Sequence, residues 1–117
     1  MATELVTAPI DRCAQGTEPA VALFRSLADP TRLAILRRLG GGEARVSDLT
    51  QALGMPQSTV SRHLACLRDC GLITYRPEGR QSFYFLSEPR LLDLLESAEV
   101  VLEATGHAVA LCPDARA

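Results

Sequence analysis

Two of the chain's four cysteines, Cys66 and Cys70, stand four residues apart in the stretch "CLRDC". If this stretch is helical, the spacing places the two thiols about 40° apart around the helix axis and about 6 Å apart along it. Both thiols could then reach one large, soft metal ion. A disulfide is disfavoured, because it needs Cβ atoms about 4 Å apart. Packing in a core is the other interpretation, since free cysteine is often buried.

Two thiolates hold a metal ion weakly, so a metal site in this chain needs a third ligand. Cys112, in the stretch "HAVALCPD" near the C-terminus, is the candidate. Three thiolates suit Cd²⁺ and Pb²⁺, whereas their softness disfavours Mg²⁺ and Mn²⁺. Zn²⁺ and arsenite are alternatives, and a thiol switch that senses oxidants would use the same cysteines. No organic cofactor is predicted.

Length and composition limit what these cysteines can do. The 117 residues fit one domain with a modest core. The N-terminal stretch lacks the basic start and apolar run of a signal peptide, and no apolar stretch approaches the roughly 20 residues of a membrane helix. We therefore expect a cytoplasmic protein with reduced thiols and no membrane partner. A thiol enzyme would need a general base and a substrate pocket, for which the chain leaves little room, so no enzyme is predicted.

The spacing of apolar residues divides the chain into an arm, a folded domain and a tail. Residues 1–17 show no periodicity and are predicted to form a flexible arm. The domain covers residues 18–106, and residues 107–117 form a tail that carries Cys112. Within the domain, helical spacing and then strand-like alternation predict these elements in order: helices over residues 18–28, 30–40, 46–54 and 56–70, strands over 72–76 and 81–86, and a helix over 87–105.

Residues that start and stop helices support this division. Asp29 followed by Pro30 is typical of an N-cap and a first helical position. Ser47 is expected to cap the third helix. Gly54 separates two short helices by a tight turn, as a helix-turn-helix requires, and Gly79 lies in the turn of the hairpin. The order α-α-α-α-β-β-α predicts a mainly helical winged helix-turn-helix fold with a small β-hairpin.

The helix over residues 56–70 has a polar face. Val60, Leu64 and Leu67 take the core side, which turns hydroxyl, amide and arginine side chains outward. Such side chains at a helix N-terminus suit phosphates and base edges in a DNA major groove. An ordinary solvated face is the alternative when the helix is considered alone. The predicted DNA-binding residues are Gln57, Ser58, Thr59, Ser61, Arg62 and His63 on this helix, and Arg80 and Gln81 at the hairpin tip.

The charge distribution favours a nucleic-acid partner despite the formal net charge of −2. Residues 25–80 contain nine arginines and five acidic residues, whereas residues 81–117 contain two arginines and six acidic residues. The basic centre therefore predicts a face for double-stranded DNA. His63 has three possible roles: a DNA contact, support of the fold, or a metal ligand beside Cys66 and Cys70.

Three stretches resemble the ArsR/SmtB family of metal-sensing bacterial repressors. They are "LADPTRLAILRRL", "VSDLTQALGMPQSTVSRHLACLRDCGLI" and "GRQSFYFL", and the resemblance extends over residues 20–105. It implies a homodimer that binds operator DNA without metal and leaves it when metal binds. It also implies that the first and last helices form the dimer interface. The apolar stripe from Leu91 to Leu102 agrees, because it is wider than a lone surface helix needs.

The family places its metal sites in different elements, and two of these sites are missing here. Arg45 and Ser47 in "RVSDL" stand where the arsenic and cadmium site has the cysteines of "CVCDL". Only Asp93 fits the zinc and nickel pattern of the last helix. The stretch "CLRDC" together with Cys112 resembles instead the CmtR-like branch, which senses cadmium and lead with "CLRGC" and a tail cysteine.

This branch resemblance implies how the ligands are shared. Cys112 follows the last helix and could approach the recognition helix of the other subunit, where it would complete a site with Cys66 and Cys70. Cys13, in the predicted arm, is a fourth ligand, as in related cadmium sensors, or an exposed thiol. Tying the recognition helix to a tail would restrain its position against DNA, which couples the metal site to the DNA-binding surface.

Overall fold

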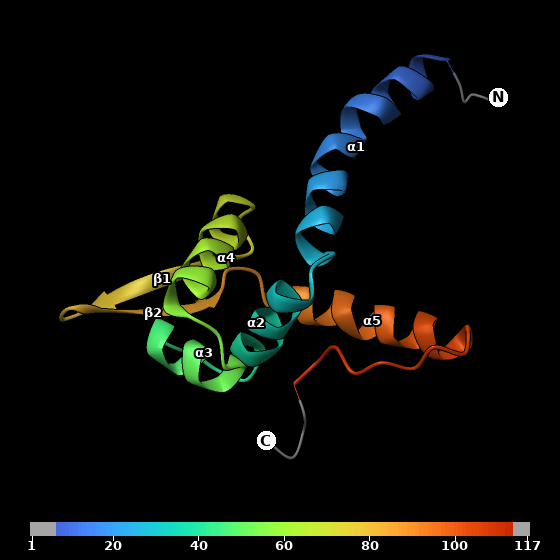
Figure 1. The fold of residues 1–117 in the computed structure, drawn as a ribbon. Coiled ribbons are helices and arrows are strands. Elements are labelled where there is room, and N and C mark those ends of the chain that lie inside the picture. Colours follow the sequence, from blue (N-terminus) through green and yellow to red (C-terminus); the bar gives the residue numbers. More distant parts are fainter. Residues whose placement is uncertain (1–6, 114–117) are drawn as a thin grey trace.

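The computed structural model describes the backbone of residues 7–113 and the side chains of residues 16–113. Its elements follow the predicted order, which confirms the winged helix-turn-helix fold (Figure 1). They are α1 (Thr7–Leu27), α2 (Pro30–Gly40), α3 (Val46–Leu53), α4 (Gln57–Asp69), β1 (Ile73–Glu78), β2 (Gln81–Leu86) and α5 (Leu91–Ala104).

The first helix is longer than its sequence pattern predicts. Apolar spacing placed its start at Glu18, but α1 begins at Thr7 and continues through Pro19. The backbone of residues 7–17, which were predicted to belong to a flexible arm, is helical. Apolar spacing detects only the part of a helix that packs against something. Helix propensity adds no signal here either, because this stretch mixes alanine, arginine and glutamine with Pro9 and Gly16.

Helices α2, α3 and α4 enclose the core together with the hairpin. The largest fully buried side chains are Ile35, Leu36, Leu49, Val60, Leu64 and Leu67. The last three are the residues that the spacing assigned to the core side of the recognition helix, α4. Their burial turns the polar face of α4 outward, so the core decides which side chains can reach DNA.

Capping groups and a glycine fix the ends of the helices around the turn. The carboxylate of Asp29 caps α2 as predicted, accepting a backbone N–H of the first turn at 2.9 Å. The predicted cap of α3, Ser47, is wrong, because the Asp48 carboxylate accepts the backbone N–H of Arg45 at 2.9 Å and makes Arg45 the N-cap. The exposed Ser47 therefore lies inside the helix. Gly54 ends α3 with φ of 66°, a left-handed conformation that glycine adopts without strain.

The wing is a two-stranded hairpin fastened to the domain at its base. Strands β1 and β2 pair antiparallel along their full lengths. Gly79, with φ of 63°, forms the turn, so Arg80 lies at the tip. The backbone N–H of Tyr84 donates to the carbonyl oxygen of Ala44 at 2.8 Å, which ties β2 to the loop before α3.

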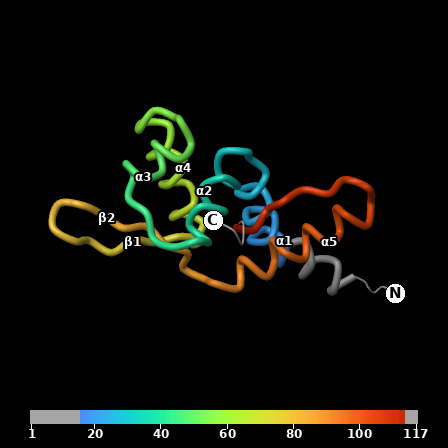
Figure 2. Tube along the Cα trace, turned by 90° about the horizontal axis from the view of Figure 1, so that it is seen from below, coloured from blue at the N-terminus to red at the C-terminus, as the bar shows by residue number. Residues whose placement is uncertain are grey.

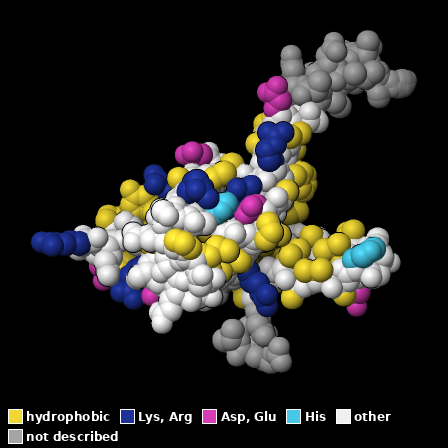
Figure 3. Space-filling view, viewed as in Figure 1, with side chains coloured by type: hydrophobic (Ala, Val, Ile, Leu, Met, Phe, Trp, Pro, Cys, Tyr) yellow, Lys and Arg dark blue, Asp and Glu magenta, His cyan; other side chains and the backbone are white. Residues whose placement is uncertain are grey.

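Helices α1 and α5 leave apolar side chains in solvent. Val21 and Phe24 on α1 are 46% and 58% exposed, and Val100 and Val101 on α5 are 61% and 60% exposed. Hydrophobic side chains are visible along both helices in the space-filling view (Figure 3). The predicted stripe on α5 is divided, because its member Leu95 is buried within the protomer.

The chain reverses after α5. Gly106, with φ of 83°, follows the helix at the reversal. Residues 107–113 then run back along α5 towards α2 (Figures 1 and 2). This return brings the tail cysteine, Cys112, against the body of its own protomer.

Candidate DNA-binding surface and metal ligands

The N-terminal part of α4 carries the polar surface that the sequence predicts for DNA. Gln57, Ser58, Ser61 and Arg62 are exposed, and Thr59 is half-buried. Their small hydroxyl and amide side chains suit close approach to a major groove. Among the described residues, Arg62 has no ion-pair partner, so its charge is available to a phosphate.

The wing holds two kinds of arginine. Arg80 at the tip is exposed and, in the described part of the chain, makes no ion pair. Arg76 on β1 binds Glu43 at 2.9 Å and also binds Glu78. These hydrogen bonds raise the pKa of Arg76 and lower the pKa of Glu43. The charge of Arg76 is compensated within the chain, so Arg80 is the better candidate for a DNA phosphate.

A second group of arginine contacts joins the wing to the start of α3. Gln81, a predicted DNA contact, is exposed, and its Oε1 accepts a hydrogen bond from Arg45 at 3.3 Å. Arg45 also binds Asp48 at 3.0 Å, which holds the pKa of Asp48 at about 2. The guanidinium groups of Arg45 and Arg76 lie 5.8 Å and 4.8 Å from the ring centre of Phe83. These contacts fix the wing relative to α3.

His63 is half-buried and faces the start of α2. Its Nδ1 lies 3.4 Å from Nη1 of Arg32 and 3.9 Å from a carboxylate oxygen of Asp29. The backbone hydrogen bond from Arg32, helped by the nearby His63, lowers the pKa of Asp29. Of the three predicted roles, these contacts favour support of the fold.

Arg32 also connects α2 to the end of α1, where a buried serine meets Cys70. The Nε of Arg32 donates to the carbonyl oxygen of Ser26 at 2.7 Å. Ser26 is 4% exposed, and its Oγ lies 2.6 Å from Sγ of Cys70, the C-cap of α4. We call Ser26, Arg32, His63 and Cys70 the α1–α2–α4 junction. No local pattern singles out Ser26, because its partner is 44 residues away.

Cys66 and Cys70 lie on adjacent turns at the C-terminal end of α4. Cys66 is half-buried, Cys70 is exposed, and both are free thiols. Gly71, with φ of 77°, follows Cys70 and ends the helix. The alternative interpretation, that these cysteines are buried in the core, is therefore wrong for Cys70, and Cys66 is only partly buried. Both thiols belong to the helix that presents the DNA-binding face, so anything bound to them acts on that helix.

Cys112 is a free thiol held against its own protomer. Its Sγ donates to the carbonyl oxygen of Leu92 on α5 at 3.6 Å. Burial, with the nearby Glu99 carboxylate, raises the pKa of this thiol. The backbone N–H of Cys112 donates to Glu99 at 2.8 Å, and its carbonyl oxygen accepts from Nε of Arg37 at 3.1 Å. The N–H groups of Cys112 and Leu111 lower the pKa of Glu99.

The predicted metal ligands do not converge within one protomer. Cys70 contacts α1, whereas Cys112 contacts α5 and α2. Over residues 16–113, no three His, Cys, Asp or Glu side chains lie close enough together to hold a metal ion. The side chain of Cys13 lies outside the described residues. A site built from all three thiols therefore needs the partner subunit or a movement of the tail.

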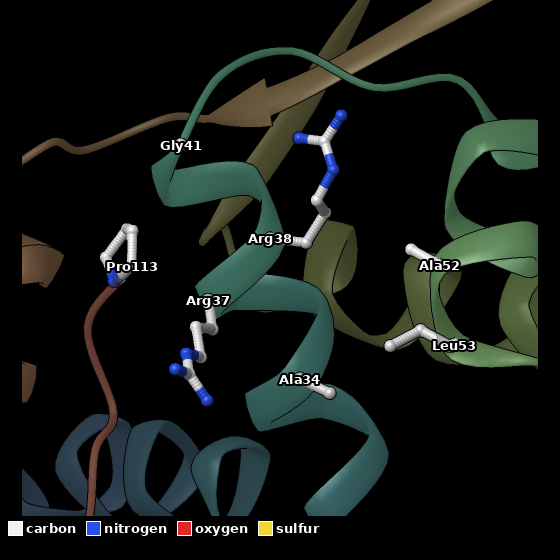
Figure 4. A pocket seen from close by; sticks show the side chains of 7 residues that line it. All are labelled: Ala34, Arg37, Arg38, Gly41, Ala52, Leu53 and Pro113. Carbon is white, nitrogen blue, oxygen red and sulfur yellow. The ribbon is translucent and has the colours of Figure 1, made fainter. Parts of the chain in front are cut away.

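An open groove lies between α2, α3 and the end of the tail (Figure 4). Arg37 and Arg38 extend in different directions from α2, and Nη1 of Arg38 donates to the carbonyl oxygen of Gly42 at 3.1 Å. None of the described cysteines lines the groove, so it lacks the nucleophile of a thiol enzyme. The lining residues are Ala34, Arg37, Arg38, Gly41, Ala52, Leu53 and Pro113.

Comparisons with known proteins agree with this surface. Residues 29–75 match the family model described as "Bacterial regulatory protein, arsR family". The HTH-type transcriptional regulator CmtR of Mycobacterium tuberculosis is 47% identical over 81 residues, which cover 68% of this chain and 69% of that protein. A probable mercury resistance operon repressor of Streptomyces lividans is 37% identical over 89 residues, which cover 76% of this chain and 71% of that protein.

A solved structure from Mycobacterium bovis has the same fold. It is a homodimeric winged helix-turn-helix DNA-binding domain described as a possible ArsR-family transcriptional regulator. The TM-score is 0.73 at 31% sequence identity, and the match covers 80% of this chain and 86% of the other.

The winged helix and the polar face of α4 define a DNA-binding transcriptional regulator and not an enzyme. The family match spans α2 to β1 and so includes the whole recognition helix. The chain belongs to the ArsR/SmtB family of metal-sensing transcriptional repressors. Within the described residues, no helix is long and apolar enough to cross a membrane.

Proposed function

We propose that this chain is a cytoplasmic, homodimeric repressor that binds operator DNA without metal and releases it when Cd²⁺ or Pb²⁺ binds to Cys66, Cys70 and Cys112. The observation that carries the proposal is the pair of free thiols on adjacent turns of the DNA-binding helix. Zn²⁺ and arsenite are alternative effectors. Hg²⁺ is another, because the Streptomyces relative is named a probable mercury resistance operon repressor.

The donors on this chain fit a soft ion. Thiolates bind soft ions in preference to Mg²⁺ or Mn²⁺. Cys66 and Cys70 are separated by about 6 Å along the helix axis, a distance that one large ion can bridge. Neither thiol is locked in the core. Cys112 supplies the third thiolate from the tail, which gives a donor set that Cd²⁺ and Pb²⁺ accept.

Helices α1 and α5 are the proposed dimer interface. Their exposed apolar side chains, including Phe24 and Val101, form the kind of surface that soluble proteins bury against a partner. The M. bovis relative is described as homodimeric. At about 100° per residue, Val101 lies roughly opposite Glu99 on α5, so the tail does not cover this surface. In the dimer, Cys112 would complete the metal site on α4 of the partner.

The α1–α2–α4 junction supplies a physical link between the thiols and both functional surfaces. Cys70 contacts Ser26 of the proposed dimer helix, and Arg32 connects Ser26 to His63 of the recognition helix. Drawing Cys70 into a metal site would remove its contact with Ser26 and shift α4 against α1. Operator binding depends on the separation of the two recognition helices in a dimer, so such a shift weakens it.

A mixed dimer tests the crossing site. One chain carries Cys66→Ser and Cys70→Ser, and the other carries Cys112→Ser. If Cys112 crosses to the partner, this dimer keeps one intact site. It then binds Cd²⁺ and shows half the thiolate-to-metal absorption of the parent dimer, which has two sites. If ligands come from one chain only, no intact site remains and tight binding is lost. The matched control is a dimer in which both chains carry Cys112→Ser.

The single variants test the effector. Cys66→Ser, Cys70→Ser and Cys112→Ser should each bind operator normally but lose most of the metal response, because a serine hydroxyl is a poor ligand for a soft ion. Titration with Cd²⁺, Pb²⁺, Zn²⁺, Hg²⁺ and arsenite ranks the effectors. A repressor that releases DNA after mild oxidation, but not after any of these additions, would instead be a thiol redox switch.

A further inference from the structure

The tail is fastened to its own protomer at the position of its cysteine. Glu99 on α5 accepts the backbone N–H groups of both Leu111 and Cys112, the second at 2.8 Å. From α2, Nε of Arg37 donates to the carbonyl oxygen of Cys112 at 3.1 Å. The Sγ of Cys112 reaches the carbonyl oxygen of Leu92 at 3.6 Å. The backbone and the thiol of Cys112 are therefore both engaged within one chain.

Packing at the next residue closes the same contact. Pro113 lies over Gly40 at the end of α2, where a Cβ atom on residue 40 would stand 2.9 Å from Cγ of Pro113 and 2.8 Å from Cδ2 of Leu92. Such distances are too short for a real side chain, so the tail and Leu92 fill the space that glycine leaves. We call Arg37, Gly40, Leu92 and Glu99 the tail dock.

We propose that the tail dock parks Cys112 on its own protomer in the metal-free repressor, and that the tail must leave the dock before Cys112 can join Cys66 and Cys70. This inference rests on the proposed function for its metal. It adds a docked state of the tail that competes with metal binding. The docked thiol is bound to Leu92 on α5, whereas Cys70 is bound to Ser26 on α1. The two halves of the proposed site thus have separate partners before metal arrives.

A parked third ligand sets the metal concentration at which the repressor responds. Apparent affinity is the intrinsic affinity multiplied by the fraction of chains in the competent state. Every contact in the dock lowers that fraction, so loosening the dock should tighten metal binding. This sign is unusual for a substitution beside a ligand, because loss of a supporting contact ordinarily weakens a metal site.

Two substitutions loosen the dock by different routes. Glu99→Ala removes the acceptor of two backbone N–H groups. Gly40→Ala adds a methyl group against Pro113 and the Leu92 side chain and leaves every dock hydrogen-bonding group in place. Glu96→Ala is the matched control, because Glu96 also places a negative charge near Cys112 but is exposed and lies outside the dock hydrogen bonds.

The test measures amide hydrogen exchange of Leu111 and Cys112 in the metal-free dimer, and Cd²⁺ affinity in the same preparations. In both dock variants, exchange should become faster and Cd²⁺ should bind about tenfold more tightly, if the docked state outweighs the free one by about ten to one. Glu96→Ala should leave both quantities within about twofold of the parent. Adding Cys112→Ser to Glu99→Ala should abolish the gain in affinity.

The outcomes separate the dock from the proposed function. Faster exchange with unchanged or weaker Cd²⁺ binding overturns the dock as an opposing state, and unchanged exchange in both variants overturns the dock itself. In either case the proposed function stands as long as Cys112→Ser abolishes the metal response. If Cys112→Ser keeps a full metal response, the assignment of Cys112 as a ligand fails, and the proposal of a parked ligand fails with it.

Discussion

The part of the protein from α2 to β2, which we call the reading unit, buries its apolar side chains within one chain, whereas the flanking helices α1 and α5 do not. Between α2 and β2, side chains such as Leu36, Leu49 and Leu64 are fully buried within one chain. On α1 and α5, Phe24 and Val101 are 58% and 60% exposed. Within the reading unit, Arg45 and Arg76 also have ion-pair partners in the same chain.

This difference indicates which part of the molecule depends on a second copy. A unit with a closed core can present a DNA-binding face from one chain, whereas apolar helices in solvent need a partner. The proposed metal site spans the division, because Cys66 and Cys70 belong to the reading unit and Cys112 follows the flank. If this proposal holds, the response to metal is a change in how the two parts are held together.

Val101→Glu should disrupt the proposed dimer interface on α1 and α5, and we expect it to have the largest effect of the substitutions considered. A carboxylate at an apolar interface is costly to bury without a partner, so the dimer should dissociate at micromolar concentration. A monomer contacts only one half-site, and operator affinity should fall by about a hundredfold or more. Sedimentation velocity and operator titration measure the two effects.

The control for this prediction is Glu96→Gln, a change of one charge on another side of α5. It should leave both the dimer and operator affinity unchanged. Val101 is a better test position than Leu94, which packs against the core of its own protomer. A Val101→Glu protein that stays dimeric would place the interface elsewhere on the molecule.

Arg62→Ala and Arg80→Ala test the reading unit, with Arg76→Ala as the matched control. Each of the first two should weaken operator binding by about tenfold and reduce the salt dependence by about one unit of slope, because each removes one phosphate contact. Arg76 is occupied by Glu43 and Glu78, so its removal should change operator affinity by less than about threefold. Equal effects for all three arginines would contradict the conclusion that Arg76 stabilises the wing and does not contact a DNA phosphate.

Local signals in the sequence were sufficient for most of the reading unit. The Asp29 cap and the turn glycines Gly54 and Gly79 lie where predicted, because capping and left-handed turns depend on neighbouring residues. The outward face of α4 was predictable for a similar reason. Once Val60 and Leu64 are assigned to the core, helical geometry fixes what points away.

The sequence could not predict contacts that depend on how elements pack. Ser26 meets Cys70 across 44 residues, and Glu43 meets Arg76 across 33. The docking of Cys112 on Glu99 also had no signal, because it depends on the chain reversal after α5. The length of α1 had no signal either, because the residues before Glu18 carry no apolar periodicity.

Ser26→Ala tests the contact between the reading unit and the flanking helix α1. The substitution removes the hydroxyl partner of Cys70 but none of the proposed metal ligands or DNA contacts. We expect operator affinity without metal and Cd²⁺ affinity to change by less than about threefold. The ratio of operator affinities without and with Cd²⁺ should fall by about fivefold, because the coupling loses one of its contacts.

The readout for Ser26→Ala is a pair of operator titrations, without metal and with saturating Cd²⁺. Ser26→Thr, which restores a hydroxyl, is the control and should recover part of the ratio. A normal ratio in Ser26→Ala would show that metal acts on α4 without α1. A loss of Cd²⁺ binding instead would make Ser26 a determinant of the site and not of the coupling.

The smallest expected effect concerns the ion pair of Arg45 and Asp48, which is complete within one chain. Arg45 holds the pKa of Asp48 at about 2, below its usual 3.8, so the stabilisation is fully present above pH 3.8 and is lost as the pH falls through about 2. Asp48→Asn should lower Tm by no more than about 3 °C at pH 6, because the pair is exposed, and the difference from the parent should shrink towards pH 2.5. Since the pair needs no partner subunit, thermal melts should give the same pH-dependent difference in a Val101→Glu background. A difference that disappears in the monomer would mean that the reading unit also depends on the dimer.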